Sequence, residues 1–204
     1  MRERFIVIEG LDGSGKSTQV NLLAKRLRRS EAKKRFKHTG VITTVEPTSD
    51  RIGKLIRLVL EHRWICPPDA LQLLFAADRA DHLGKKIKPA IANGKMIISD
   101  RYFFSTIGYG APANSRAWLK QLNKNFPTPD ITFFIAVFPK ECMRRIRKRK
   151  STKTIFEKQK QLEQVWKNYT LLAKEYPRVH IVDGMRSPEE ISDEIYDVLS
   201  HGEK

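Results

Sequence analysis

One eight-residue segment near the start of the chain limits the possible folds more than any other. It reads Gly-Leu-Asp-Gly-Ser-Gly-Lys-Ser, residues 10–17, and fits the pattern G-x-x-x-x-G-K-[ST]. So short a pattern also arises by chance, but its context argues against that reading. Residues 5–9 form an apolar, β-branched run, and the apolar residues after the segment recur at helical spacing. The order strand, glycine-rich loop, helix predicts a phosphate-binding loop in an α/β fold.

The residue types of this loop suit a nucleoside triphosphate bound with Mg²⁺. Glycines let successive backbone N–H groups point at phosphate oxygens, and the positive end of the next helix adds to the attraction. We expect Lys16 to reach the β and γ phosphates of ATP, and Ser17 to place its hydroxyl on Mg²⁺. The expected ATP-binding residues of the loop are Gly10, Leu11, Asp12, Gly13, Ser14, Gly15, Lys16, Ser17 and Thr18. The loop alone does not identify the reaction, because GTPases, ATP-driven motors and small-molecule kinases all use it.

Helical and strand patterns alternate along the rest of the chain. Further strands are expected at residues 41–45, 96–98, 131–137 and 179–184. We expect a long helix from Pro67 to break and restart near residues 84–89, and a Gly/Ala/Pro-rich loop at residues 108–113. Strands that are apolar on both faces indicate a parallel sheet covered on both sides. We therefore predict a three-layer α/β/α fold with a five-stranded parallel sheet, in one domain over residues 1–204.

The charge of the chain is concentrated in two segments. Lys and Arg number 39 against 23 Asp and Glu, a formal +16, which raises the question of a nucleic-acid partner. Residues 25–37 and 140–153 each hold eight bases and one acid, so together they account for +14. The rest of the chain is therefore close to neutral.

Composition also limits the compartment. The chain is 40% hydrophobic, too much for a disordered chain, and no apolar run approaches the roughly 20 residues of a membrane helix. The first residues show no signal-peptide pattern, so we expect a cytoplasmic protein without membrane contact. Cys66 and Cys142 lack C-x-x-C spacing, and we expect two ordinary buried thiols.

Three clusters of polar and aromatic residues should meet near the loop. Residues 46–48 and 100–102 follow the second and third strands, and Phe75 lies with Asp78 and Arg79 on the long helix. Ligands of parallel sheets bind at the carboxyl ends of the strands. An aromatic ring, arginines and a carboxylate beside a phosphate loop suit a second, flat, anionic substrate.

Six segments together match a known family pattern. They are residues 8–19, residues 46–48 with Gly53 and Arg57, residues 74–79 with His82, residues 99–102 with Ser105, residues 129–130, and the Arg-rich helix with residues 156–157. Through them nearly the whole chain resembles the thymidylate kinase family. The resemblance implies Mg²⁺-dependent phosphoryl transfer from ATP to dTMP, giving dTDP and ADP for dTTP biosynthesis. It also implies the P-loop kinase form of the three-layer fold, a homodimer and a mobile helical lid, here at about residues 144–157.

The resemblance also implies roles around the acceptor base and sugar. Phe75 would stack on thymine, Arg79 would hydrogen-bond the base, and Ser105 would lie near its other polar edge. Asp12 would accept the 3′-hydroxyl, and Tyr109 would lie against the deoxyribose and crowd out a 2′-hydroxyl. For Phe75 the alternative is a core aromatic on an amphipathic helix.

Further roles concern the phosphates and the metal. Arg101 and Arg57 would hold the dTMP phosphate, which suits a guanidinium fork. Asp100 would orient the Mg²⁺ shell through water, and Glu46 belongs to the expected substrate-binding set. The alternatives are a solvated helix arginine for Arg57 and a helix cap for Asp100.

The expected lid explains the second basic segment. Phosphoryl transfer spreads negative charge, and the nucleophile is an already ionised phosphate that needs no general base. Some family members carry an arginine in the loop; this chain has Gly13 there and resembles the subgroup whose catalytic arginine comes from the lid. We favour Arg147 or Arg149 for the phosphates and Arg144 or Arg145 for stacking on adenine, with Lys153 near the lid. The alternative for each is a solvated basic helix face.

Two departures from the family pattern affect these assignments. The family often has Tyr-Gln where this chain has Tyr109-Gly110, so a side-chain contact to substrate is missing or supplied elsewhere. Lys153 stands where relatives have an arginine, and a lysine lacks the planar fork.

The sequence also allows three other functions. A deoxynucleoside kinase would need a base such as Glu46 to deprotonate a sugar hydroxyl. A broader pyrimidine nucleoside monophosphate kinase is the second alternative. A nucleic-acid-binding P-loop ATPase would use the positive charge. For residues 25–37 we favour a solvated surface, with contact to a polyanion as the alternative, and we expect nucleotides rather than nucleic acid as ligands.

Overall fold

A five-stranded parallel sheet forms the centre of the structure. The computed structural model describes residues 4–149 and 155–201. The strands are β1 (Phe5–Gly10), β2 (Val41–Val45), β3 (Met96–Asp100), β4 (Ile131–Ala136) and β5 (Val179–Asp183). They pair in the order β2-β3-β1-β4-β5, and every pairing is parallel. The predicted α/β fold is confirmed.

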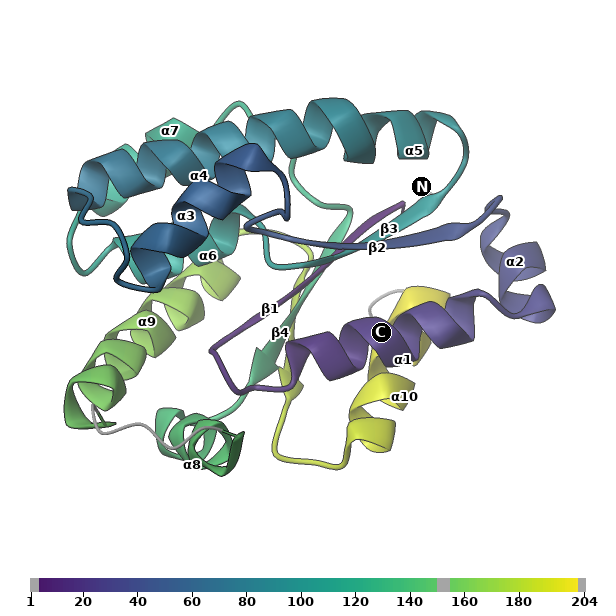
Figure 1. Cartoon of the computed structure of the whole chain (residues 1–204). Coiled ribbons are helices and arrows are strands. Elements are labelled where there is room, and N and C mark those ends of the chain that lie inside the picture. Colours follow the sequence, from purple (N-terminus) through teal and green to yellow (C-terminus); the bar gives the residue numbers. More distant parts are fainter. Residues whose placement is uncertain (1–3, 150–154, 202–204) are drawn as a thin grey trace.

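Helices cover both faces of the sheet (Figure 1). On one face, α1 (Lys16–Leu27) packs on β1, β2 and β3, and α10 (Pro188–His201) packs on α1 and β5. On the other face, α5 (Lys88–Ala92) packs on β3, α6 (Phe103–Gly110) on β1 and α9 (Ile155–Glu175) on β5. The remaining helices are α2 (Ser30–Phe36), α3 (Arg51–Leu60), α4 (Pro68–His82), the π-helix η1 (Leu83–Ile87), α7 (Arg116–Asn123) and α8 (Pro139–Arg149).

Burial differs between the central and the edge strands. All residues of β1 and β3 are buried, and so are five of the six in β4. Strand β2 has no buried residue and β5 has one. Strands β2 and β5 lie at the two edges of the sheet, where a strand has a neighbour on one side only and its backbone is therefore more exposed.

The long helix from Pro68 continues to Ala92 instead of breaking. Helix α4 passes through the π-turn η1 directly into α5. Pro89 has no N–H and its ring crowds the carbonyl four residues earlier, which explains why the helix widens here into the i→i+5 pattern. The predicted break is wrong because one π-turn accommodates the proline.

Residues 103–110 form helix α6, so the loop predicted at residues 108–113 begins too early. The two glycines at its end serve close packing: a Cβ at Gly108 would lie 3.2 Å from the Tyr169 ring, and one at Gly110 2.9 Å from Gln72 Cδ. Tertiary contacts thus favour glycine inside this helix.

Both cysteines are free thiols, and Cys142 is buried as expected whereas Cys66 is only half-buried. No helix among the described residues is long and apolar enough to cross a membrane.

Candidate functional site

The glycine-rich loop connects β1 to α1 with a backbone that glycine favours. Gly10, Gly13 and Gly15 have φ values of 151°, 85° and 99°, in the left-handed half of conformational space. The Ser14 N–H donates to the Leu11 carbonyl over 3.1 Å, which closes the turn. Helix α1 begins directly after Gly15, so its free N–H groups border the loop. This geometry forms an anion cradle.

Lys16 is buried beneath the loop, with 6% of its surface exposed. Its Nζ donates to the Leu11 carbonyl over 2.8 Å. Burial, and after it the charge of nearby Arg101, lower the pKa of Lys16 to about 8, although Asp12, Asp100 and Glu9 oppose the shift. A phosphate bound here would favour the charged ammonium.

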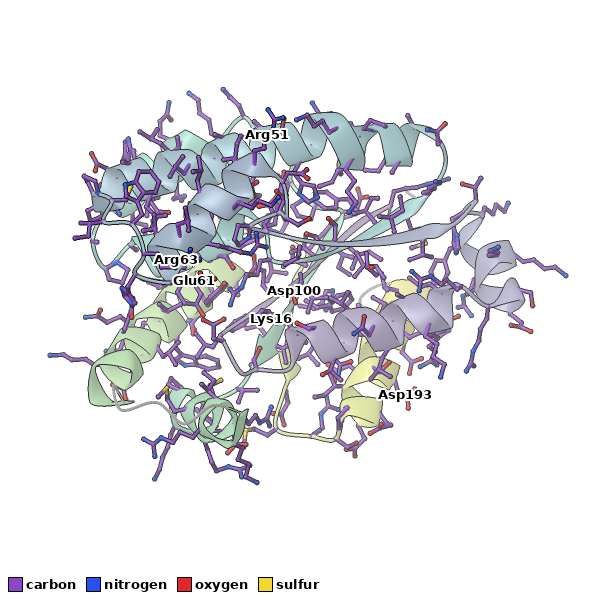
Figure 2. The ribbon with its side chains drawn as sticks, in the orientation of Figure 1. Lys16, Arg51, Glu61, Arg63, Asp100 and Asp193 are labelled. Atoms are coloured by element: carbon purple, nitrogen blue, oxygen red, sulfur yellow. The ribbon has the colours of Figure 1, made fainter. Side chains whose placement is uncertain are left out.

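Ser17, the second residue of helix α1, contacts Asp100 at the end of β3. The Ser17 hydroxyl donates to Asp100 Oδ2 over 2.6 Å, and Figure 2 shows Lys16 and Asp100 beside one another at the start of α1. Both side chains offer hard oxygen ligands, which Mg²⁺ prefers. Within the described part of the chain, no group of three or more His, Cys, Asp or Glu residues could hold a metal by itself.

Two adjoining pockets lie at the carboxyl edge of the sheet. One, of about 430 Å³, is lined by the loop with Ser17, Thr18, Arg57 and Asp100. The other, of about 240 Å³, is lined by aromatic and polar side chains from α4 and α6. Asp12, Glu46 and Arg101 line both pockets. The structure thus brings together the three clusters that the sequence placed after separate strands and on the long helix.

Arg101 lies between the two pockets on a strained backbone. Its φ is +74°, a region that costs of order 1–3 kcal/mol for a residue other than glycine. Its Nη2 donates to Asp12 Oδ1 over 2.5 Å, and its Nη1 to Ser105 Oγ over 2.7 Å. Burial raises the pKa of Asp12, but the charges of Arg101 and Lys16 outweigh it, so the net shift is downward. Asp12 is therefore an ionised partner for Arg101 at neutral pH.

Glu9 is a buried residue of this site that sequence reasoning missed. Its carboxylate accepts hydrogen bonds from the Tyr102 N–H (2.8 Å), the Ser105 hydroxyl (2.7 Å) and the Tyr169 hydroxyl (2.8 Å). Burial raises the pKa of Glu9, although Arg101 and these donors oppose the shift. The signal in the sequence was an acid at the end of an apolar strand, next to Gly10.

A second buried network holds the acceptor side of the pocket. Arg79 Nε donates to Glu46 Oε2 over 2.9 Å, and His82 Nδ1 lies 3.1 Å from Glu46 Oε1. The guanidinium also donates to Asn123 Oδ1 and, over 2.9 Å, to Thr106 Oγ1. Arg79 is 1% exposed and lines the pocket, so these partners hold its guanidinium at the pocket wall.

The other expected acceptor residues lie around the same two pockets. Phe75 is half-buried and lines the smaller pocket, so it is outside the hydrophobic core. The Tyr109 hydroxyl accepts from the Asp12 N–H over 3.0 Å. Arg57 Nη2 donates to the Pro47 carbonyl over 2.7 Å and Nη1 donates to the Thr48 carbonyl, which fixes the loop after β2.

Helix α8 packs directly on the phosphate loop. A Cβ at Gly13 would lie 2.7 Å from the Cys142 carbonyl, so a side chain there would displace the helix. Arg145 Nη1 donates to the Ser14 carbonyl over 3.4 Å and Nη2 to the Gly184 carbonyl over 3.1 Å. Arg145 therefore joins the loop to the turn after β5.

Among the described residues, the other basic side chains of the expected lid form no hydrogen bond or ion pair with the phosphate loop, and those described are exposed. Arg144 pairs with Glu141 over 2.6 Å, and its side chain is 58% exposed. Arg147 is exposed on the same helix. Arg149 ends α8 with its side chain outside the described part, and Lys153 lies outside the described residues.

The basic segment at residues 25–37 lies away from this site, on the end of α1 and on α2 (Figure 1). Arg26 pairs with Asp193 over 2.5 Å and covers the Tyr196 ring, with 3.9 Å from its Cζ to the ring centroid. Arg35 donates to the Ser200 carbonyl over 2.9 Å. The exposed remainder is Lys25, Arg28, Arg29, Lys33, Lys34 and Lys37.

Comparison with known proteins shows a likeness along nearly the whole chain. The profile of the thymidylate kinase family matches residues 8–195. A protein named "Probable thymidylate kinase" from Pyrococcus horikoshii is 41% identical over 210 residues, covering 98% of each chain. Proteins of the same name are 43% identical in Thermococcus gammatolerans, covering 94% of this chain and 93% of that one, and 36% identical in Methanocaldococcus jannaschii, covering 97% and 96%.

Proposed function

The chain belongs to the thymidylate kinase family, and we propose that it transfers the γ-phosphoryl group of ATP to dTMP, producing ADP and dTDP. One observation carries this proposal: a phosphate-loop pocket and a pocket with an aromatic and arginine lining adjoin and share Asp12 and Arg101. Transfer between two nucleotides requires their phosphates to meet, because catalysis here is mainly positioning and charge stabilisation.

The residues of the loop would hold the donor phosphates. Its N–H groups, the start of α1 and the Lys16 ammonium present positive charge to the β and γ phosphates. Arg101, which lines both pockets, would stabilise the charge of the group in transfer. The acceptor phosphate is already ionised at neutral pH, so no side chain has to act as a general base.

The side-chain oxygens of Ser17 on α1 and Asp100 at the end of β3 fit Mg²⁺. Mg²⁺ keeps several waters and uses one or two protein oxygens together with substrate phosphates, which agrees with Ser17 Oγ and Asp100 Oδ2 as the oxygens present. Ser17 would bind the ion and Asp100 would orient its water shell. The ion, when bound, supplies charge neutralisation to the phosphates.

The smaller pocket would hold dTMP. Phe75 would stack on the base, Arg79 would donate to it, and Tyr109 would lie against the sugar beside Asp12. Arg101 and Arg57 would hold the acceptor phosphate. Arg57 already bonds two carbonyls, so this role requires it to contribute donors that those bonds leave free.

A deoxynucleoside kinase is less well supported. That reaction needs a base for the sugar hydroxyl, and both carboxylate oxygens of Glu46 have partners, Arg79 and His82. The arginines around the pocket also favour an acceptor that carries its own phosphate.

The assembly and compartment belong to the same proposal. We place one domain over residues 1–204, with a lid at about residues 144–157, a range that includes the end of α8 and the start of α9. Exposed apolar side chains on α3, α4 and their connection, Leu55, Trp64, Ile65 and Leu73, support a homodimer. Free thiols support a cytoplasmic enzyme. Light scattering after size-exclusion chromatography tests the dimer.

A nucleotide panel tests the activity. With ATP and Mg²⁺ we expect turnover of dTMP, none of thymidine, and abolition by Lys16→Ala. Turnover of thymidine without dTMP would establish the deoxynucleoside kinase instead. ATP hydrolysis stimulated by DNA, with steep salt dependence and no response to dTMP, would establish the nucleic-acid-binding ATPase.

A further inference from the structure

Two polar atoms in the wall of the smaller pocket are buried without a partner among the described residues. They are Gln72 Oε1 and the Tyr102 hydroxyl. Gln72 is 6% exposed and Tyr102 is fully buried. A buried polar atom without a hydrogen bond costs about 1–3 kcal/mol, so a partner that enters the pocket would recover that cost.

Gln72 lies on the same face of α4 as two expected base contacts. Gln72, Phe75 and Arg79 are spaced i, i+3 and i+7, which places them one above the other on a helix. All three line the pocket. The amide is therefore presented beside the ring that would stack on the base and the guanidinium that would donate to it.

The space around the Gln72 amide is shared with position 110. A Cβ at Gly110 would lie 2.9 Å from Gln72 Cδ and 3.0 Å from Gln72 Oε1. A side chain at position 110 and the Gln72 amide thus exclude one another. The Gln72 amide on α4 therefore fills space that α6 leaves open by having glycine at position 110.

We propose that Gln72 is a specificity-determining residue for the acceptor, with its Oε1 accepting the N3–H of thymine. This inference rests on the proposed function. Arg79 is a donor only and therefore selects a ring carbonyl, while the amide oxygen of Gln72 selects an adjacent N–H. A carbonyl next to an N–H is the imide edge of thymine and uracil, whereas cytosine has an acceptor at N3 and an amino group beside it.

The first test compares wild type with Gln72→Met, which keeps the side-chain volume and removes the amide. We expect KM for dTMP to rise about tenfold, the equivalent of one hydrogen bond of about 1.4 kcal/mol, with KM for ATP unchanged. The preference for dTMP over N3-methyl-dTMP, a probe without the N–H, should fall by a similar factor. Gln121→Met, at an exposed glutamine on α7, is the matched control and should leave all constants unchanged.

The second test moves the amide from one helix to the other. Gly110→Gln alone should weaken dTMP binding, because the new side chain meets Gln72. Gln72→Ala with Gly110→Gln should recover KM for dTMP to within about threefold of wild type. Such non-additivity requires the two amides to share one place.

Either of two results with Gln72→Met would overturn the inference: a KM for dTMP within twofold of wild type, or discrimination against N3-methyl-dTMP equal to that of wild type. A double variant no better than Gln72→Ala would also contradict it. These failures differ from failure of the proposed function, in which the wild-type enzyme itself would not phosphorylate dTMP.

Discussion

The Tyr169 hydroxyl donates a 2.8 Å hydrogen bond to the buried carboxylate of Glu9, and so joins α9 to the first strand of the sheet. The same hydroxyl lies 2.8 Å from Ser105 Oγ, which accepts from Arg101 Nη1 over 2.7 Å. The first residues of helix α9 belong to the expected lid. Tyr169 therefore connects the lid side of the molecule to the arginine shared by both pockets.

Removal of this hydroxyl should disturb the position of Arg101. In Tyr169→Phe, Glu9 loses a donor, and a buried group without its partner costs about 1–3 kcal/mol. We expect kcat to fall about tenfold at saturating nucleotides, with a smaller change in either KM. Steady-state kinetics with each nucleotide varied in turn measures both constants.

Tyr176→Phe is the control for this change. Tyr176 follows the same helix and packs its ring against Phe103 and Phe104, which phenylalanine would preserve. Wild-type kinetics are expected there. A Tyr169→Phe enzyme with wild-type kcat but a lower melting temperature would show that the bond is structural only.

The buried position of Lys16 predicts an alkaline limit to catalysis. Its folded-state pKa is lowered to about 8, so the free enzyme loses the ammonium charge as pH rises through 8. The second ionisation of a phosphate monoester, near pH 6, is already complete there. We expect kcat/KM for ATP to be constant near pH 7 and to fall with an apparent pKa of about 8, because this ratio reports on the free enzyme.

Lys16→Arg separates this group from others. A guanidinium stays charged above pH 12, so the variant should lose the alkaline limb even if its activity is low throughout. The assignment to Lys16 fails if the limb persists in the variant, or if wild-type kcat/KM is flat up to pH 9.5.

Phe75→Ala tests whether this ring binds substrate or supports the core. Loss of stacking on one base costs about 1–3 kcal/mol, so KM for dTMP should rise five- to 150-fold, with KM for ATP unchanged. The melting temperature should change little, because the ring is half-buried beside the pocket. A core aromatic would instead lose about 3–5 kcal/mol of stability.

Phe138→Ala serves as a control, since that ring is 63% exposed after β4. It should leave KM for dTMP unchanged. An unfolding free energy reduced by several kcal/mol in Phe75→Ala, with normal KM for dTMP, would assign Phe75 to the core.

Gly53 should tolerate no side chain. A Cβ there would lie 1.9 Å from the Thr48 carbonyl, in the loop that Arg57 and Asp78 hold in place. We expect Gly53→Ala to lower the free energy of unfolding by about 1–3 kcal/mol, or more if the loop cannot move. Urea denaturation measures the change.

Gly84→Ala is the matched control, because a Cβ at Gly84 meets nothing within 4 Å. The substitution should be neutral or slightly stabilising, since alanine has a higher helix propensity than glycine. Equal destabilisation of the two variants would contradict the steric explanation for Gly53.

The amino-acid sequence by itself determined the features that depend on neighbouring residues. The loop at residues 10–17 requires only consecutive residues with the right backbone freedom, and its strand and helix are recognisable from the spacing of apolar side chains. The same holds for Phe75 and Arg79, one helical turn apart on α4. The break predicted near residues 84–89 was wrong because a π-turn absorbs a proline at little local cost.

Only the tertiary structure decided which distant side chains share a buried space. Glu9 and Tyr169 are 160 positions apart, and Arg145 reaches Ser14 across 131. Gln72 is buried against Gly110 because α4 packs on α6, which no local pattern in either helix predicts. Contacts of this kind depend on how helices settle on the two faces of the sheet, and that is set by the packing of the whole chain rather than by any one segment.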